Sequence, residues 1–161
     1  MPFSVTIEQE ALQKLSRELK KHGDGKLLRR ELNRELRAAG EPTKREAQAN
    51  LHALSTPGGP SPAVTADVAR RVKTESRLSG RQPGARVRLR KGGPRKFEWA
   101  GRRLNRKRGF RHRVFGRDVW VRQVASQVEW FDRATRAHRK DYRAAAVDAI
   151  EKMLRKIKVR G

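Results

Sequence analysis

The chain has 161 residues, which is the size of one ordinary domain. Its 41 Lys and Arg against 17 Asp and Glu leave a formal charge of +24, and only 35% of the residues are hydrophobic. We therefore expect a small core that partners or neighbouring subunits complete. The chain has no cysteine, no apolar run long enough to cross a bilayer and no signal-peptide pattern, which argues against a disulfide scaffold and a membrane protein.

The first 54 residues predict a short strand followed by two helices. Alternation of apolar and polar residues predicts a strand over 3–7. Leucines recur at three- and four-residue spacing over 8–22, and the glycines that follow predict a helix end. A second leucine stripe predicts helix over 25–54, broken or kinked near Gly40, as a helical arm or a packed layer.

The centre of the chain predicts a loop, a short helix and a β-hairpin. Residues 55–62 are rich in proline and glycine, so we expect an irregular loop that a partner orders. A short helix is expected over 63–72. Strands are expected over 73–79 and 85–91, and the second alternates arginine with apolar residues, which predicts one cationic and one apolar face.

The last third of the chain predicts one more strand and a long helix. Residues 95–116 show the least periodicity, and no regular element is predicted there. A strand is expected over 119–124 and a helix over 128–158. Together the elements predict an α+β fold: one small antiparallel sheet packed by the N-terminal and C-terminal helices, plus the helical arm. This single domain has four segments, which are residues 1–54, 55–62, 63–127 and 128–161.

The excess positive charge lies mainly in the third segment. Residues 63–127 hold 20 Lys and Arg against 4 Asp and Glu. Seven cations fall within twelve residues. Because they repel one another, we expect a charge-contact surface whose side chains extend into solvent in an isolated subunit. These candidates are Arg102, Arg103, Arg106, Lys107, Arg108, Arg111 and Arg113.

Aromatic residues gather in and just after the same segment. We expect four of them to be structural anchors: Phe115, Trp120, Trp130 and Phe131. For the tryptophans, packing of the last helix on the sheet is favoured over an exposed interface position, in which Trp is also enriched. Arginines interleaved with aromatics equally suit phosphate contact and base stacking, and periodicity alone does not separate this interpretation from ordinary core packing.

The sequence shows no pattern that indicates catalysis or a bound cofactor. The four histidines have no metal-ligand spacing, and no nucleophile, phosphate-loop or dinucleotide motif occurs. The carboxylates of the basic segment are spread apart and are expected to pair with arginines: Asp67, Glu75, Glu98 and Asp118. We therefore expect no catalytic, cofactor or metal site, and an enzyme is disfavoured.

Several local patterns, in this order, resemble a known family. Two basic helices and a Pro/Gly loop precede the hairpin Val72-Lys73-Thr74…Gly84-Ala85-Arg86-Val87. Next come Arg111-His112-Arg113-Val114-Phe115-Gly116, Trp120-Val121-Arg122-Gln123, and Trp130-Phe131 at the head of a long helix. The chain thereby resembles the neck or tail-completion proteins of long-tailed bacteriophages, in the actinobacteriophage branch labelled minor tail or head-to-tail connector proteins. It departs from them at Glu129, where members commonly have glycine, and it lacks their Thr-Gly-x-Leu signature.

The resemblance implies a structural virion protein that joins or completes the tail at the head–tail interface. It implies a homo-oligomeric ring, with a hexamer favoured, that contacts the adjoining connector and the tail-tube or tail-terminator proteins, and packaged DNA as a further contact. It implies no cofactor and no membrane, and a location in the virion neck after assembly in the host cytoplasm. The alternative is a basic nucleic-acid-binding protein, ribosomal-like or nucleoid-associated.

The resemblance also bears on what neutralises the seven cations. DNA slides through a neck during ejection, and a dense ring of arginines in the channel would hold it. Carboxylates of an adjoining protein ring are therefore favoured over DNA phosphates as the partners.

Overall fold

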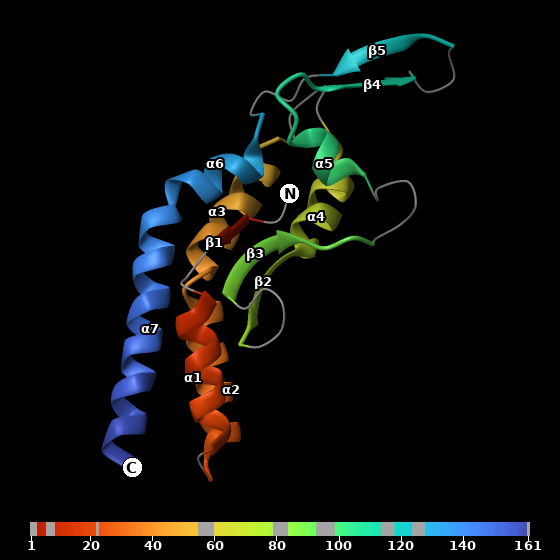
Figure 1. The fold of residues 1–161 in the computed structure, drawn as a ribbon. Coiled ribbons are helices and arrows are strands. Elements are labelled where there is room, and N and C mark those ends of the chain that lie inside the picture. Colours follow the sequence, from red (N-terminus) through yellow and green to blue (C-terminus); the bar gives the residue numbers. More distant parts are fainter. Residues whose placement is uncertain are drawn as a thin grey trace. The chain divides into compact units, whose positions relative to one another are not determined.

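Figure 1 shows a computed structural model of the chain, which describes residues 3–5, 9–21, 23–54, 60–78, 84–92, 99–113, 118–123 and 128–160. The fold is α+β, as the sequence predicts. Contacts divide the chain into two units, each of which consists of separate stretches. Unit 1 comprises Met1–Thr43, Thr74–Arg88 and His138–Gly161, and unit 2 comprises Lys44–Lys73 and Leu89–Ala137.

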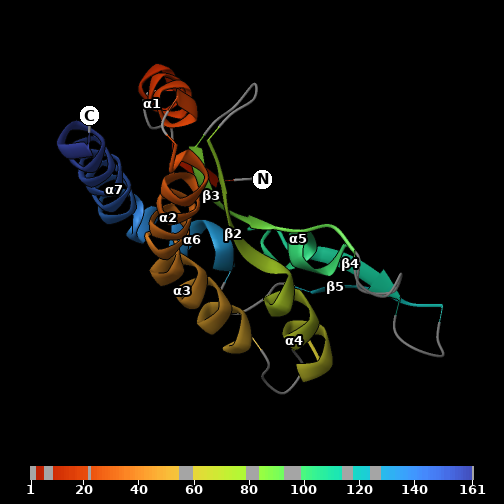
Figure 2. The same cartoon turned by 90° about the horizontal axis from the view of Figure 1, so that it is seen from below.

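Three helices form the body of unit 1: α1 (Gln9–Lys21), α2 (Gly25–Ala38) and α7 (Arg139–Arg160). Figure 2 shows them nearly end-on, with α7 beside the other two. The leucine stripes predicted from the sequence supply Leu12, Leu15, Leu19, Leu28, Leu32 and Leu36, and α7 adds Tyr142, Ala146, Ala149, Ile150 and Met153. Each fully buried leucine contributes about 1.5–3 kcal/mol, so this cluster stabilises the unit.

The turn between α1 and α2 requires glycine. A Cβ atom on Gly25 would overlap the backbone carbonyl of Leu19, so the two helices approach closely only without a side chain there. Because α2 buries Leu28, Leu32 and Leu36 against its own unit, it is a packed layer rather than a free arm. The predicted interruption near Gly40 is observed, since α2 ends at Ala38 and α3 (Glu41–His52) begins three residues later.

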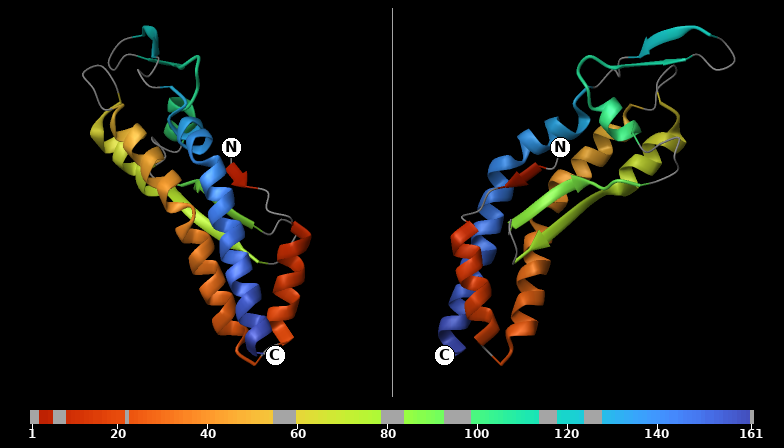
Figure 3. Two further views of the ribbon diagram at one scale, coloured as in Figure 1. Left: turned by 90° about the vertical axis from the view of Figure 1, so that its left-hand side faces the viewer. Right: turned by 45° about the vertical axis from the view of Figure 1, so that its right-hand side comes forward.

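A three-stranded sheet has the order β1–β3–β2, formed by β1 (Phe3–Val5), β2 (Val72–Arg77) and β3 (Gly84–Leu89). In the antiparallel register of β1 and β3, Phe3 lies opposite Val87. Val87 is fully buried, while the arginines between the apolar residues of β3 are partly exposed, as the alternation predicts. Ser76 of β2 donates to Asn33 Oδ1 at 2.8 Å, which fixes the strand to α2. Figure 3 shows the three strands beside the helices of this unit.

Unit 2 contains most of α3, then α4 (Pro62–Arg71), α5 (Ala100–Leu104) and α6 (Trp130–Ala137). Pro62 occupies the first turn of α4, where its missing N–H costs no hydrogen bond. Gly101 of α5 lies against Val68 and Leu89, where a side chain would not fit. Of the predicted loop over 55–62, residues 55–59 lie outside the described part of the chain.

A second sheet has two strands, in which β4 (Phe110–Arg113) pairs with β5 (Trp120–Gln123). This sheet corrects two predictions about strands. The prediction that 119–124 joins the first sheet is wrong, because its partner is the segment 110–113, where no strand was predicted. That segment alternates Arg with Phe and His, and therefore lacks the apolar alternation by which strands are recognised.

The predicted helix over 128–158 is also corrected, because it consists of two helices that meet at His138. Neither proline nor glycine marks the break in the sequence. The break coincides with the boundary between the two units, at Ala137 and His138.

Candidate interaction surfaces

Trp130 and Phe131 are buried, with 1% and 4% of their surfaces exposed, so their prediction as core anchors is confirmed. Their partners are helices rather than a sheet. Trp130 Nε1 donates to the carbonyl of Gly101 in α5 at 3.2 Å, and the Trp130 carbonyl accepts from Asn50 of α3 at 3.2 Å. The amide of Phe131 donates to Asn105 Oδ1 at 2.9 Å. The pair therefore anchors α6 to α3 and α5.

Trp120 is 52% exposed, so the prediction that it is a core anchor is wrong. It lies on β5, whose only described strand partner is β4, and no second layer covers its ring. The guanidinium of Arg113 stacks 5.5 Å from the ring centroid instead. The fourth predicted anchor, Phe115, lies outside the described residues.

All seven candidate cations are exposed, as predicted, and they follow one another over α5, the turn after it and β4. Arg102 stacks 5.7 Å from the centroid of Trp99, a ring that is itself 49% exposed. Lys107 lies 3.8 Å from a carboxylate oxygen of Glu129, and Arg113 lies 2.9 Å from Asp118. These are solvent-exposed pairs, which contribute about 0–1 kcal/mol each.

The register of β4 and β5 arranges arginines on one face of the two-stranded ribbon. Arg111 lies opposite Arg122, and Arg113 lies opposite Trp120. Residues directly opposite each other in an antiparallel pair, and residues two apart along a strand, project to the same side. We call this surface, which consists of Arg111, Arg113, Trp120 and Arg122, the arginine face.

The carboxylates of the basic segment pair with arginines, as predicted, wherever the structure describes them. Asp67 lies 3.0 Å from Arg71, and Glu75 lies 3.2 Å from Arg86. With Asp118 held by Arg113, three of the four predicted carboxylates are neutralised locally. The fourth, Glu98, lies outside the described residues.

Glu129 has a backbone conformation that favours glycine, with a φ of 59°. Its side chain contacts two cations, Lys107 at 3.8 Å and Arg136 at 3.3 Å. These contacts offset part of the cost of the left-handed conformation. The residue immediately precedes Trp130, so this turn sets the entry of the chain into α6.

Unit 1 exposes apolar side chains beside its core. Leu27 of α2 is 63% exposed and Val159 of α7 is 87% exposed, and on α7 Val147 and Leu154 are also exposed. Glu31 and Lys156 form an ion pair between the two helices, and Leu27 and Val159 each lie about one turn from it, at the same end of the helix pair. The apolar surface of α7 is therefore wider than the part that unit 1 covers.

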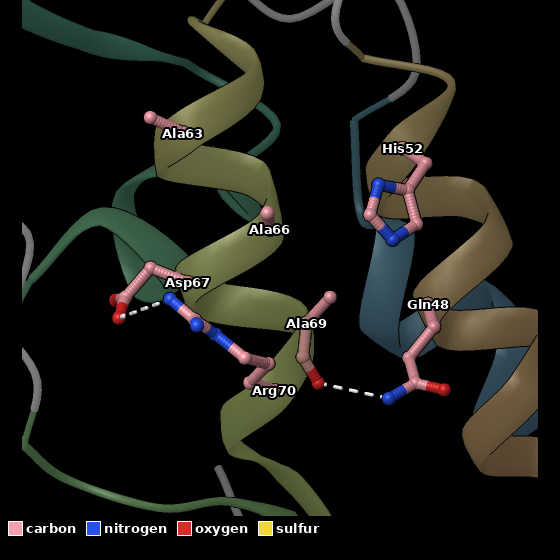
Figure 4. A pocket seen from close by; sticks show the side chains of 7 residues that line it. All are labelled: Gln48, His52, Ala63, Ala66, Asp67, Ala69 and Arg70. Atoms are coloured by element: carbon pink, nitrogen blue, oxygen red, sulfur yellow. Dashed lines mark hydrogen bonds and ion pairs between the residues drawn. The ribbon is translucent and has the colours of Figure 1, made fainter.

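Figure 4 shows a hollow of about 490 Å³ between α3 and α4 in unit 2. Its floor is formed by alanines 63, 66 and 69, and Gln48 and His52 face them from α3. Gln48 Nε2 donates to the Ala69 carbonyl at 2.9 Å, and the Asp67 carboxylate is paired with Arg70 and Arg71. Gln48, Asp67 and Arg70 are thus engaged in contacts of their own, and the alanines that line the hollow offer no polar group besides their backbone.

Within the described residues, no three His, Cys, Asp or Glu side chains gather as a metal site would require. No helix of that part of the chain is both long and apolar enough to span a membrane.

The sequence did not predict that residues 110–113 form the partner strand of β5, nor which hydrophobic side chains are exposed. The alternation of Arg111 and Arg113 around His112 is the signal from which the arginine face could have been predicted. Leu27 adjoins Leu28 but lies off the leucine stripe, a position that indicates exposure. Comparisons of the chain with protein-family models, with curated proteins and with solved structures found no match.

Proposed function

We propose that the chain is a structural protein of the bacteriophage neck, of the tail-completion type, which assembles as a ring at the head–tail joint. The proposal rests on the family resemblance of its sequence patterns and on one observation that carries it furthest. Val147 and Leu154, seven residues apart on one side of α7, leave apolar side chains exposed on unit 1 that a protein partner would cover. The occupant that we infer is a second copy of the chain, because ring closure places copies side by side.

The backbone at Glu129 lends independent support. Members of the resembled family commonly have glycine before the Trp-Phe pair, and here the same position has a φ of 59°. A backbone turn of the kind that favours glycine thus precedes Trp130-Phe131 although the glycine itself is replaced.

Oligomeric mass tests the proposal. Native mass spectrometry of the purified chain at micromolar concentration should give one closed ring, with six copies favoured. The double variant Val147→Glu/Leu154→Glu should shift the mass to that of the monomer while the circular dichroism spectrum stays unchanged. The control is Val119→Glu, which changes an exposed valine of unit 2 and should leave the ring intact. A wild-type chain that remains monomeric at every concentration would reject the self-assembling ring.

A second candidate, a ribosomal-like or nucleoid-associated nucleic-acid-binding protein, is favoured by the arginine face and the exposed tryptophans. Salt separates the two functions. Binding of free nucleic acid weakens steeply as salt rises, whereas a ring held by apolar contacts persists. A ring that forms at both low and high salt therefore supports the neck protein over this alternative.

A further inference from the structure

The arginine face joins like charges that nothing within the described chain neutralises fully. Arg111 and Arg122 lie directly opposite each other on β4 and β5, an arrangement that is destabilising for an isolated ribbon. Arg113 has a carboxylate partner in Asp118. For Arg111 and Arg122 the described residues provide no ion pair, and Arg122 Nε donates to the Arg108 carbonyl at 2.9 Å instead.

Further cations lie on the segments that precede the ribbon in the chain. Arg102, Arg103, Arg106 and Arg108 are exposed on α5 and the turn that leads into β4, and within the described residues none of them pairs with a carboxylate. The surface therefore carries several positive charges in excess of its carboxylates. An anionic partner that relieves the repulsion stabilises the folded ribbon by binding to it.

The stacked side chains restrict the positions of two guanidinium groups. Arg113 lies over Trp120 at 5.5 Å, and Arg102 lies over Trp99 at 5.7 Å. A guanidinium held against an indole loses less conformational entropy when its N–H groups bind an anion. Each stacked arginine is thus arranged to donate to anionic oxygens, and planar guanidinium groups bind phosphate in this way with two parallel hydrogen bonds.

The density of cations on this surface bears on which partner fits it better, a nucleic acid or an acidic protein. A protein partner would need a comparable cluster of carboxylates, which repel one another on its own surface. Duplex DNA carries one negative charge per roughly 1.7 Å of its axis as a fixed property, and its major groove admits a two-stranded β-ribbon. The resemblance to neck proteins favoured protein carboxylates as the partners, whereas the paired arginines of the two-stranded ribbon favour DNA.

From these observations we propose that the arginine face of the β4–β5 ribbon, together with the exposed arginines of α5 and its following turn, binds the phosphate backbone of duplex DNA. The phosphates interact with Arg111 and Arg122 from the ribbon and with Arg102 at the end of α5. No base-specific contact is part of this assignment, so binding is independent of DNA sequence.

Fluorescence anisotropy with the full chain and a labelled duplex of about 20 base pairs tests the assignment. The test variant is Arg102→Gln/Arg111→Gln/Arg122→Gln, which removes the three arginines assigned to phosphate contact. The matched control removes three exposed arginines of unit 1, Arg17→Gln/Arg30→Gln/Arg143→Gln, and so has the same net charge. We expect Kd to rise about tenfold or more for the test variant and about twofold for the control, with a shallower salt slope only in the test variant. The single variant Arg111→Gln should show the same direction if the triple variant folds poorly.

Three outcomes would overturn the proposal. Equal weakening in both triple variants would assign binding to net charge alone. Tighter binding of single-stranded DNA than of duplex would exclude the fit of the ribbon to a groove. Displacement of the duplex by polyglutamate at equal charge concentration would assign the surface to an acidic protein. DNA binding and ring mass are measured separately, so the failure of one proposal leaves the other standing.

Discussion

Unit 1 and unit 2 reach a folded state by different means. In unit 1, leucines spaced at helical intervals on α1 and α2 meet the apolar side of α7, and the cluster excludes water over three helices. In unit 2, Trp130 is the largest buried side chain, and polar contacts from Asn50, Asn105 and the Gly101 carbonyl fix its surroundings. The core of unit 1 thus consists mainly of leucines of similar size, whereas unit 2 combines apolar burial with a tryptophan whose polar groups have specific partners.

Charge separates the units as well. Unit 1 holds 21 Lys and Arg against 11 Asp and Glu, and unit 2 holds 20 against 6. The two units also differ in their exposed aromatic residues, since Trp99 and Trp120 of unit 2 are about half exposed. The proposals assign association with a second copy to unit 1 and binding of an anion to unit 2.

The largest expected effect comes from removing the side chain on which unit 2 depends. Trp130→Ala should destabilise the protein by about 3–5 kcal/mol, because it leaves a cavity and deprives the Gly101 carbonyl of its donor. Urea denaturation measures the loss, and hydrogen exchange should show it first in α5 and α6. A folded Trp130→Ala monomer of wild-type stability that only fails to assemble would overturn its core assignment.

A smaller effect is expected at the turn before Trp130. Glu129→Ala keeps the left-handed strain and loses the contacts to Lys107 and Arg136, whereas Glu129→Gly loses the contacts and also removes the strain. We expect the glycine variant to be more stable than the alanine variant by about 1–2 kcal/mol in thermal unfolding. Equal stability of the two variants would show that this backbone conformation is not maintained in solution.

In unit 1, pH probes the core at Tyr142. Burial raises the pKa of its phenol above the ordinary value of 10.0, so the unfolded chain loses this proton first as pH rises. The stability that depends on the neutral phenol is complete below pH 10 and declines above it, by about 1 kcal/mol at pH 11. Relative to wild type, Tyr142→Phe should lose less stability between about pH 9 and about pH 11 in urea titrations. Parallel declines of the two proteins would contradict this prediction.

The smallest loss of stability is expected from substitution of Trp120, in contrast to the large loss expected at Trp130. Because the ring is 52% exposed, Trp120→Ala should change the free energy of unfolding by less than about 0.5–1 kcal/mol. A loss as large as that of Trp130→Ala would show that the ring is buried in solution. Intrinsic fluorescence gives an independent check, since an acrylamide quencher should reach Trp120 readily.

Much of the fold was predictable because its signals are local. The spacing of Leu12, Leu15 and Leu19 and the glycines after them identified α1, and the helix expected over 63–72 begins one residue earlier, at Pro62, which had been assigned to the loop. The pairing of β4 with β5 was not predictable in this way. It depends on which strands meet in space, and Arg111 and Arg113 do not show the apolar alternation of a half-buried strand.

The candidate surfaces were only partly predictable. The seven cations and their exposure followed from composition alone, since so many charges cannot be buried. The role of Trp120 was misassigned because aromatic residues are usually core and its partner strand was unknown. Arg122 gained its significance only from the register of β4 with β5, which a single sequence does not display.

The discontinuous make-up of unit 1 has a consequence for synthesis on the ribosome. Its first helices are translated before unit 2, whereas Tyr142, Ala146 and Met153 are translated only after it. The leucines of α1 and α2 therefore remain uncovered on one side until all of unit 2 has been translated. Nascent chains arrested before α7 should consequently bind chaperones through these leucines, and release of the C-terminal helix should end that exposure.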